Sequence, residues 1–241
     1  MKLDTRVLPD LVSLSRAALE ETLSIIQGAV AKRGRFAIAL SGGHTPAKMY
    51  SMWAQTDQYR NKTPWDRVHL FWSDERYVPA DDPRSNYRMA REALVSHVLI
   101  PAENVHPMPT NLSSPEECAR AYEAELRKFF GAEPPAFDVQ LLGIGDEGHT
   151  ASLFPGSPVL DEKLRWVAAV RVAAEPPQRL TLTPVVLNQG RNTFFLVAGE
   201  GKRTILSAIR HEPDAKPSQY PAARIHPATE PVWFLDQAAA G

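Results

Sequence analysis

Short apolar runs recur along the chain and alternate with segments whose apolar residues follow helical spacing. Six runs have the composition of β-strands: Arg35–Leu40, Val68–Trp72, Phe137–Ile144, Trp166–Val170, Thr193–Ala198 and Pro231–Leu235. Because these runs are apolar on both faces, they predict an α/β fold with a mostly parallel sheet covered on both sides by helices. No internal repeat, charge run or compositional shift marks a boundary, so we expect residues 1–241 to form a single domain.

The helical segments carry recognisable end signals. Asp10 is a candidate N-cap for the first helix, and Gly34 is a candidate stop. Ser114, with Glu117 three residues later, has the form of a capping box and opens a helix that runs to Gly131. Further helical patterns cover Leu11–Ala29, Asn86–Leu99 and Gly201–Arg210.

Charge and cysteine content exclude several classes of protein. Lys and Arg number 27 against 28 Asp and Glu, so no global positive field exists to hold nucleic acid or an anionic membrane. The single cysteine, Cys118, permits no intrachain disulfide and favours a reducing compartment, so we expect a cytoplasmic protein. No apolar run approaches the roughly 18 residues that a membrane span requires.

The segment from Leu141 to Gly156, LLGIGDEGHTASLFPG, is the strongest candidate for chemistry. A buried strand opens into a loop in which glycines bracket Asp146 and Glu147, followed by His149 and a possible helix start at Thr150. A histidine has an ordinary pKa of about 6.5, so it can act as a base near neutral pH, and a neighbouring carboxylate can orient its ring. The alternative is a histidine that only caps the following helix.

Two further loops follow predicted strands. In Ser41–Pro46, Gly42 and Gly43 precede a helix start with Thr45 as N-cap and Pro46 at the first position, an arrangement that attracts phosphate. The alternative is a tight turn with an ordinary cap. Ser73–Arg76 reads as a charged turn, and a solvated surface turn is its simpler interpretation. However, the carboxyl ends of parallel strands share one sheet edge, where all three loops would form a site.

Two cations later in the chain can extend this site. Arg179 alone is more typical of a surface cation, whereas Lys202 opens a helix after a strand and a glycine turn, from which it can reach a phosphate. A metal site has less support, because no HxxxH, HExxH or clustered cysteine pattern is present.

Six blocks of sequence, in this order, resemble the 6-phosphogluconolactonase family within the glucosamine-6-phosphate isomerase/6-phosphogluconolactonase superfamily. They are LSGGHTP, WSDERYVP, LLGIGDEGHTASLFPG, PPQRLTLT, GEGK and WFLDQAA, and they extend from the first predicted strand almost to the C-terminus. The resemblance implies a Rossmann-like three-layer α/β/α sandwich that hydrolyses 6-phosphogluconolactone in the pentose phosphate pathway, with a sugar-phosphate substrate and no cofactor or metal. We expect a monomer.

The resemblance also implies roles for individual residues. His149 is the expected general base, with Asp74, Arg76 and Glu147 at the reacting end, and the expected phosphate-binding residues are Gly42, Gly43, Thr45, Arg179 and Lys202. Where the family usually has Asp-Gly-His, this chain has Glu147, so either Asp146 or Glu147 is the candidate to orient His149. His44 replaces a Ser that is frequent in the family.

Two alternative functions are weaker. Glucosamine-6-phosphate deaminases resemble the chain at the glycine loop and at Asp74, but they carry Tyr in place of Arg76 and an acid after the histidine loop. The segment Thr150–Phe154 has no acid, which removes one candidate proton shuttle for an isomerisation. A sugar-phosphate sensor normally needs a DNA-binding or partner module, for which this chain has no basic region.

Overall fold

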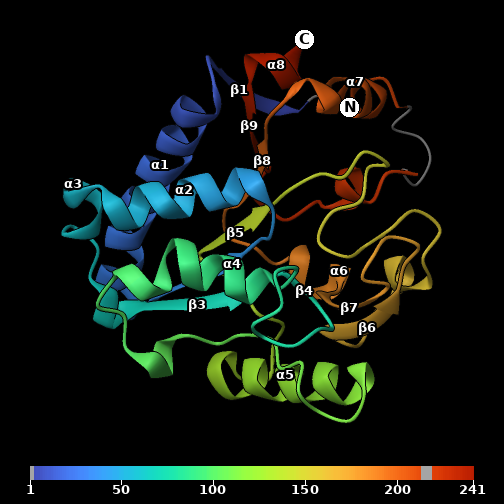
Figure 1. Cartoon of the computed structure of the whole chain (residues 1–241), viewed down its shortest axis with the longest axis horizontal. Helices are drawn as coiled ribbons and strands as arrows, with labels where there is room; N and C mark the ends of the chain where they lie inside the picture. The colour runs from blue at the N-terminus through green and yellow to red at the C-terminus, as the bar shows by residue number, and fades with distance from the viewer. Residues whose placement is uncertain (1–2, 213–218) are drawn as a thin grey trace.

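A six-stranded, entirely parallel sheet forms the centre of the computed structural model, which describes residues 3–212 and 219–241 (Figure 1). The strand order is β1-β9-β8-β5-β2-β3. The strands are β1 (Asp4–Leu8), β9 (Val232–Asp236), β8 (Thr193–Val197), β5 (Val139–Leu142), β2 (Phe36–Leu40) and β3 (Val68–Trp72). Every residue of β2, β5 and β8 is buried, which explains why these strands are apolar on both faces.

Helices cover this sheet on both sides, so the expected three-layer α/β/α arrangement is confirmed (Figure 1). Helix α1 lies against β2, β8 and β9 and packs on α2, whereas α5 lies across the sheet from α2. The helices are α1 (Leu11–Arg33), α2 (His44–Gln55), α3 (Asp57–Arg60), α4 (Asn86–Ala93), α5 (Pro115–Phe130), α6 (Pro184–Leu187), α7 (Arg203–Arg210) and α8 (Gln237–Ala240). Within residues 3–212 and 219–241, no helix is long and apolar enough to cross a membrane.

A second, antiparallel sheet was not expected from the sequence. It has the order β4-β7-β6 and consists of β4 (Asp74–Arg76), β7 (Gln178–Leu182) and β6 (Val167–Arg171). The prediction of a charged turn at Ser73–Arg76 is therefore wrong, because these residues pair with β7 and bury Glu75. The run Trp166–Val170 is a strand as predicted, but it belongs to this small sheet rather than to the parallel one.

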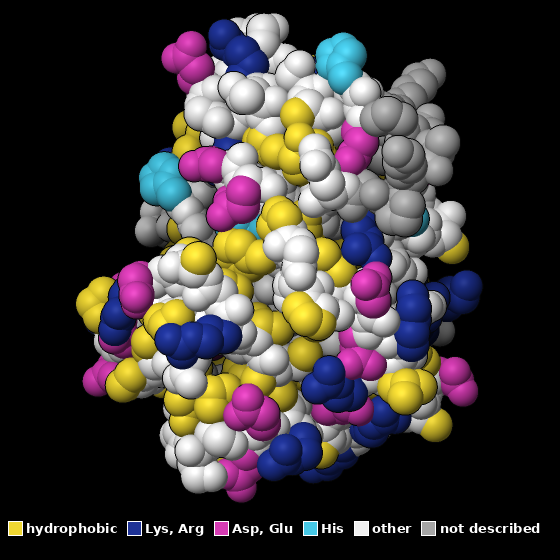
Figure 2. Space-filling view, turned by 90° about the vertical axis from the view of Figure 1, so that its right-hand side faces the viewer, with side chains coloured by type: hydrophobic (Ala, Val, Ile, Leu, Met, Phe, Trp, Pro, Cys, Tyr) yellow, Lys and Arg dark blue, Asp and Glu magenta, His cyan; other side chains and the backbone are white. Residues whose placement is uncertain are grey.

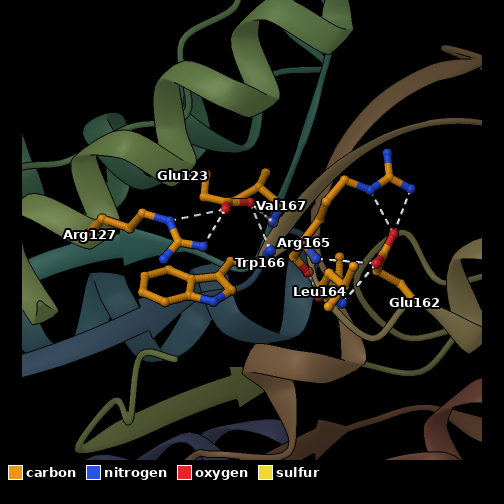
Figure 3. Close-up of polar contacts among 8 residues, drawn as sticks. Glu123, Arg127, Glu162, Leu164, Arg165, Trp166 and Val167 are labelled. Carbon is orange, nitrogen blue, oxygen red and sulfur yellow. Dashed lines mark hydrogen bonds and ion pairs between the residues drawn. The ribbon is translucent and has the colours of Figure 1, made fainter. Parts of the chain in front are cut away.

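Polar contacts attach the small sheet to α5 (Figure 3). One carboxylate oxygen of Glu123 accepts hydrogen bonds from the backbone N–H groups of Trp166, at 2.8 Å, and of Val167, at 3.2 Å. Arg127 pairs with Glu123 and places its guanidinium 3.9 Å from the centre of the Trp166 ring. Just before β6, Glu162 accepts three backbone N–H groups from residues 163–165, which lower the pKa of its carboxyl to about 2. The contacts of Glu123 and Arg127 hold the start of β6, and with it the small sheet, against α5.

Several predicted helix ends differ in the structure. Asp10 caps α1 through Ser13 and Gly34 ends it in the left-handed region, as expected. However, α2 begins at His44 with Gly43 as N-cap, so Thr45 lies inside the first turn and is not the cap. Residues 150–153 form a tight turn closed by a Thr150–Leu153 bridge, so the helix start expected at Thr150 is absent. Hydrogen bonds to other segments, described below, hold this turn.

A pair of stacked histidines lies at the edge strand β3. Nδ1 of His69 is 3.2 Å from Nε2 of His106, and Nδ1 of His106 is 2.7 Å from a carboxylate oxygen of Glu125. Burial, with added repulsion from His106 and Arg35, lowers the pKa of His69 to about 4. Folding therefore favours the neutral form of His69.

Candidate active site

The loops that follow β2, β3 and β5 meet at one open pocket of about 250 Å³. Most of the predicted site residues line it: Gly42, Gly43, Asp74, Arg76, His149, Arg179 and Lys202. Thr45 and Glu147 do not line it, and His44 is exposed on α2 outside the pocket. The carboxyl edge of the parallel sheet thus assembles residues that are up to 160 positions apart in the chain.

The glycine loop is held close to α4. The hydroxyl of Tyr50 accepts a hydrogen bond from the N–H of Ser41 at 3.0 Å and donates one to the Ser41 carbonyl at 2.9 Å. A Cβ atom on Gly42 would lie 1.9 Å from Oδ1 of Asn86, so only glycine permits this approach. Gly43 has a φ of 103°, in the region that favours glycine. Both glycines therefore allow a close backbone approach at the pocket wall.

The Asp74 carboxylate is 5% exposed and is held from two sides. Nδ2 of Asn86 donates to Oδ1 of Asp74 at 3.2 Å and to the Asp74 carbonyl at 2.9 Å. The hydroxyl of Ser152 donates to Oδ2 at 2.7 Å, while the N–H of Ser152 donates to the Thr181 hydroxyl at 3.2 Å. Sequence reasoning identified neither Asn86 nor Ser152, because their partners lie 12 and 78 residues away.

Glu75 is buried beneath the site and connects β4 to α4. One of its carboxylate oxygens accepts from the N–H groups of Arg76 and Asn86, both at 2.7 Å. The other accepts from the N–H of Tyr87 at 2.7 Å and from the Ser85 hydroxyl at 3.1 Å. Burial raises the pKa of Glu75, while the three backbone N–H groups oppose that rise. Glu75 thus fixes the segment that carries Asp74, Arg76 and Asn86.

Two arginines lie side by side on neighbouring strands of the small sheet. Arg76 on β4 and Arg179 on β7 are directly paired in the register. Arg179 is 5% exposed and donates to the carbonyls of Pro176, at 2.7 Å, and Glu175, at 3.2 Å. Burial, and then the charge of Arg76, lower the pKa of Arg179. In the described parts of the chain neither guanidinium forms an ion pair with a carboxylate, so the two cations offer an anion-binding corner.

His149 lies between a glycine and an aromatic ring. A Cβ on Gly145 would be 2.0 Å from both Nδ1 and Cε1 of the imidazole, and the ring of Phe154 stacks on it at 4.1 Å and 15°. Nδ1 is buried and has no hydrogen-bond partner among the described residues. Its nearest acid is Glu147, whose Oε2 is 3.0 Å away but outside hydrogen-bonding geometry. Because Nδ1 is buried, Nε2 is the ring nitrogen available to a molecule in the pocket.

The two candidate acids beside His149 have different partners. Asp146 forms an ion pair with Lys202, with 2.6 Å between Oδ1 and Nζ. The hydrogen bond and the positive charge of Lys202 lower the pKa of Asp146. Of the two acids, Glu147 is the one that contacts the imidazole, whereas Asp146 contacts Lys202. In residues 3–212 and 219–241 we find no cluster of three or more His, Cys, Asp or Glu side chains suited to a metal ion.

Residues 9–234 match the family described as glucosamine-6-phosphate isomerases/6-phosphogluconolactonase. The chain belongs to this family. It is 46% identical to the 6-phosphogluconolactonase of Synechocystis sp. over 95% of this chain and 92% of that protein. It is 42% identical to the 6-phosphogluconolactonase of Nostoc sp. over 99% of this chain and 98% of that protein. Among solved structures, the 6-phosphogluconolactonase from Trypanosoma cruzi matches with a TM-score of 0.86 and 30% identity, covering 99% of this chain and 96% of that chain.

Proposed function

We propose that this protein hydrolyses 6-phospho-D-glucono-1,5-lactone to 6-phospho-D-gluconate. The observation that carries the proposal is the convergence of His149 with three cations, Arg76, Arg179 and Lys202, in one pocket. A base with one cation for an activated carbonyl, and two further cations for a phosphate, match the two ends of a sugar-phosphate lactone. Relatives named 6-phosphogluconolactonase, which are similar along nearly the whole chain, support this substrate.

The proposed mechanism is general-base hydrolysis without a covalent enzyme intermediate. Nε2 of His149 takes a proton from water as the water oxygen attacks the lactone carbonyl. The ring C–O bond then breaks, and the ring oxygen leaves as a hydroxyl that receives the proton from the imidazolium. A positioned base typically contributes ~10²–10⁴ in rate.

Arg76 stabilises the negative charge that develops on the carbonyl oxygen, an effect typically worth ~10²–10³ in rate for one donor. Arg179, Lys202 and the glycine loop at Gly42 and Gly43 hold the phosphate, with Thr45 in the first turn of α2 behind that loop. The backbone N–H groups of the loop supply this contact whether or not the Thr45 side chain takes part. Binding at the phosphate then fixes the distance from the carbonyl to His149.

Replacing His149 by Ala tests the proposed base. We expect kcat for the lactone to fall by about 10²–10⁴ with little change in KM, because the base acts in the transition state. His44→Ala is the matched control, since His44 is exposed and lies outside the pocket. A His149→Ala enzyme with the kcat of the wild type would remove His149 from the mechanism.

The phosphate site has its own test. Lys202→Ala should raise KM chiefly, and unphosphorylated gluconolactone should be a poor substrate for the wild type. Equal rates of hydrolysis for the phosphorylated and unphosphorylated lactones would contradict the proposed phosphate-binding site. A glucosamine-6-phosphate deaminase assay run in parallel covers the main alternative, and binding of 6-phosphogluconate without any hydrolysis of its lactone would indicate a sensor.

We further propose that the whole chain is one catalytic domain that acts as a monomer in the cytoplasm, without a metal or cofactor. Its single cysteine supports a reducing compartment. The expected results are a monomeric mass by size-exclusion chromatography with light scattering and unchanged activity after prolonged chelation. Loss of activity on chelation, restored by a metal ion, would contradict the metal-independent mechanism.

A further inference from the structure

Phe154 differs from the other phenylalanines in this protein. Of the nine in the sequence, six are buried in the core and two more pack against it: Phe36, Phe71, Phe137, Phe194, Phe195, Phe234, Phe129 and Phe130. Phe154 belongs to neither group and is only partly buried. Its ring instead stacks on His149, with ring centres 4.1 Å apart and planes inclined by 15°. Core packing therefore does not account for an aromatic residue here.

The imidazole has an unusual set of neighbours for a catalytic base. Such a base is commonly held by a hydrogen bond from its second nitrogen to a carboxylate or carbonyl. Nδ1 of His149 is buried and lies 3.0 Å from Oε2 of Glu147, but the geometry of a hydrogen bond is not met there. The ring is instead confined between the face of Phe154 and the backbone of Gly145, where a Cβ would come within 2.0 Å of Nδ1.

A tight turn at residues 150–153 brings Phe154 next to His149. Ala151 adopts a φ of 48°, and the N–H of Leu153 bonds to the carbonyl of Thr150 at 2.9 Å. The Thr150 hydroxyl donates to the Gly143 carbonyl at 2.8 Å, and the Ser152 hydroxyl donates to Asp74 at 2.7 Å. The turn is thus fixed to both the β5 loop and the site, so the stacked ring has a rigid support.

We propose that Phe154 is a positioning residue that holds the His149 imidazole by stacking, alongside the Glu147 carboxylate that lies 3.0 Å from Nδ1. Gly145 supplies the opposite surface because it has no Cβ. The aromatic face restricts rotation and tilt of the ring, so Nε2 keeps one direction toward the attacking water. This proposal rests on the proposed lactonase activity, in which His149 is the base.

The kinetic test compares Phe154→Leu with Phe154→Tyr, which retains the aromatic face. For Phe154→Leu we expect kcat to fall by roughly 10- to 100-fold while KM stays within about twofold, because a displaced base lowers only the transition-state contribution. Phe154→Tyr should recover most of the activity. Gly145→Ala, which pushes on the other side of the ring, should also lower kcat. In a His149→Ala background, Phe154→Leu should have no further effect.

A spectroscopic measurement separates this proposal from the proposed function. The carbon-bound ring protons of His149 should show an upfield ring-current shift in the wild type and in Phe154→Tyr, and lose it in Phe154→Leu. Loss of kcat with a retained shift, equal activity of the Leu and Tyr variants, or a kcat for Phe154→Leu within twofold of the wild type would overturn the positioning role. A wild type that shows the shift but does not hydrolyse the lactone would instead reject the proposed function.

Discussion

Replacing the buried Glu75 by Gln changes one oxygen into an NH₂ group at nearly constant volume. Each carboxylate oxygen accepts a backbone N–H, from Arg76 and Asn86 on one side and from Tyr87 on the other. Whichever way the amide turns, its NH₂ group faces at least one of these donors. The less costly orientation puts the NH₂ toward Tyr87, because the Ser85 hydroxyl beside it can accept a hydrogen bond.

The expected cost follows from these contacts. A buried N–H left without an acceptor costs about 1–3 kcal/mol, and the remaining bonds lose the strength that the carboxylate charge provides. We therefore expect Glu75→Gln to lower the free energy of unfolding by about 2–4 kcal/mol. Equilibrium unfolding in urea, followed by tryptophan fluorescence, measures this quantity.

A matched variant controls for the loss of charge alone. Glu92 is an exposed acid that pairs with Arg88 on α4, and Glu92→Gln should change the free energy of unfolding by less than about 0.5 kcal/mol. If the free energy of unfolding of Glu75→Gln in urea lies within about 0.5 kcal/mol of the wild-type value, the argument that a backbone N–H is left without an acceptor is refuted. It would mean that the loop before α4 can rearrange to supply the missing acceptor.

Three further predictions concern other parts of the molecule. The pKa of His69 is about 4 in the folded state and near 6.5 in the unfolded state, so the free energy of unfolding should fall as the pH drops from 6.5 to 4. In urea unfolding at pH 7 and at pH 4.5, His69→Phe should make this decrease smaller by about 1–2 kcal/mol. Asp146→Asn should free Lys202 from its ion pair and lower KM about two- to fivefold at constant kcat in steady-state assays. An unchanged or higher KM would contradict the idea that Asp146 competes with the substrate phosphate for Lys202. Gly42→Ala should displace Asn86 and reduce kcat/KM by roughly tenfold or more, and wild-type kinetics would show that the 1.9 Å clash is relieved without cost.

The positions of the buried parallel strands were largely predictable, because burial on both faces leaves an apolar signature in the sequence. Strand β1 was missed because its residues Asp4–Leu8 lie at an exposed edge and include charged side chains. Strand β4 was mistaken for a turn because it consists of Asp74, Glu75 and Arg76. Burial of Glu75 depends on N–H donors about ten residues later in the chain, and no local pattern shows that they will lie there.

The sequence predicted which segments meet at the site, because the topology of the parallel sheet determines this. Parallel strands bring their carboxyl ends together, so the segments that directly follow β2, β3 and β5, with Gly42, Asp74 and His149, had to meet at one edge. Details that depend on turn geometry were not accessible. The sequence predicted a helix start at Thr150, whereas the chain forms a tight turn there that places Phe154 against His149.

Ser73 connects the two sheets through its own backbone. Its N–H bonds to the Leu40 carbonyl at the end of β2, and its carbonyl accepts the N–H of Leu182 on β7, both at 2.8 Å. The paired arginines, Arg76 and Arg179, lie next to this junction on the small sheet, whereas His149 lies in the loop after β5 of the large sheet. The span between anion corner and base is therefore a property of how two independent sheets are joined. A shift of the small sheet against the parallel core would move Arg76 and Arg179 together relative to His149, while Gly42, Gly43 and Lys202 stay with the parallel core.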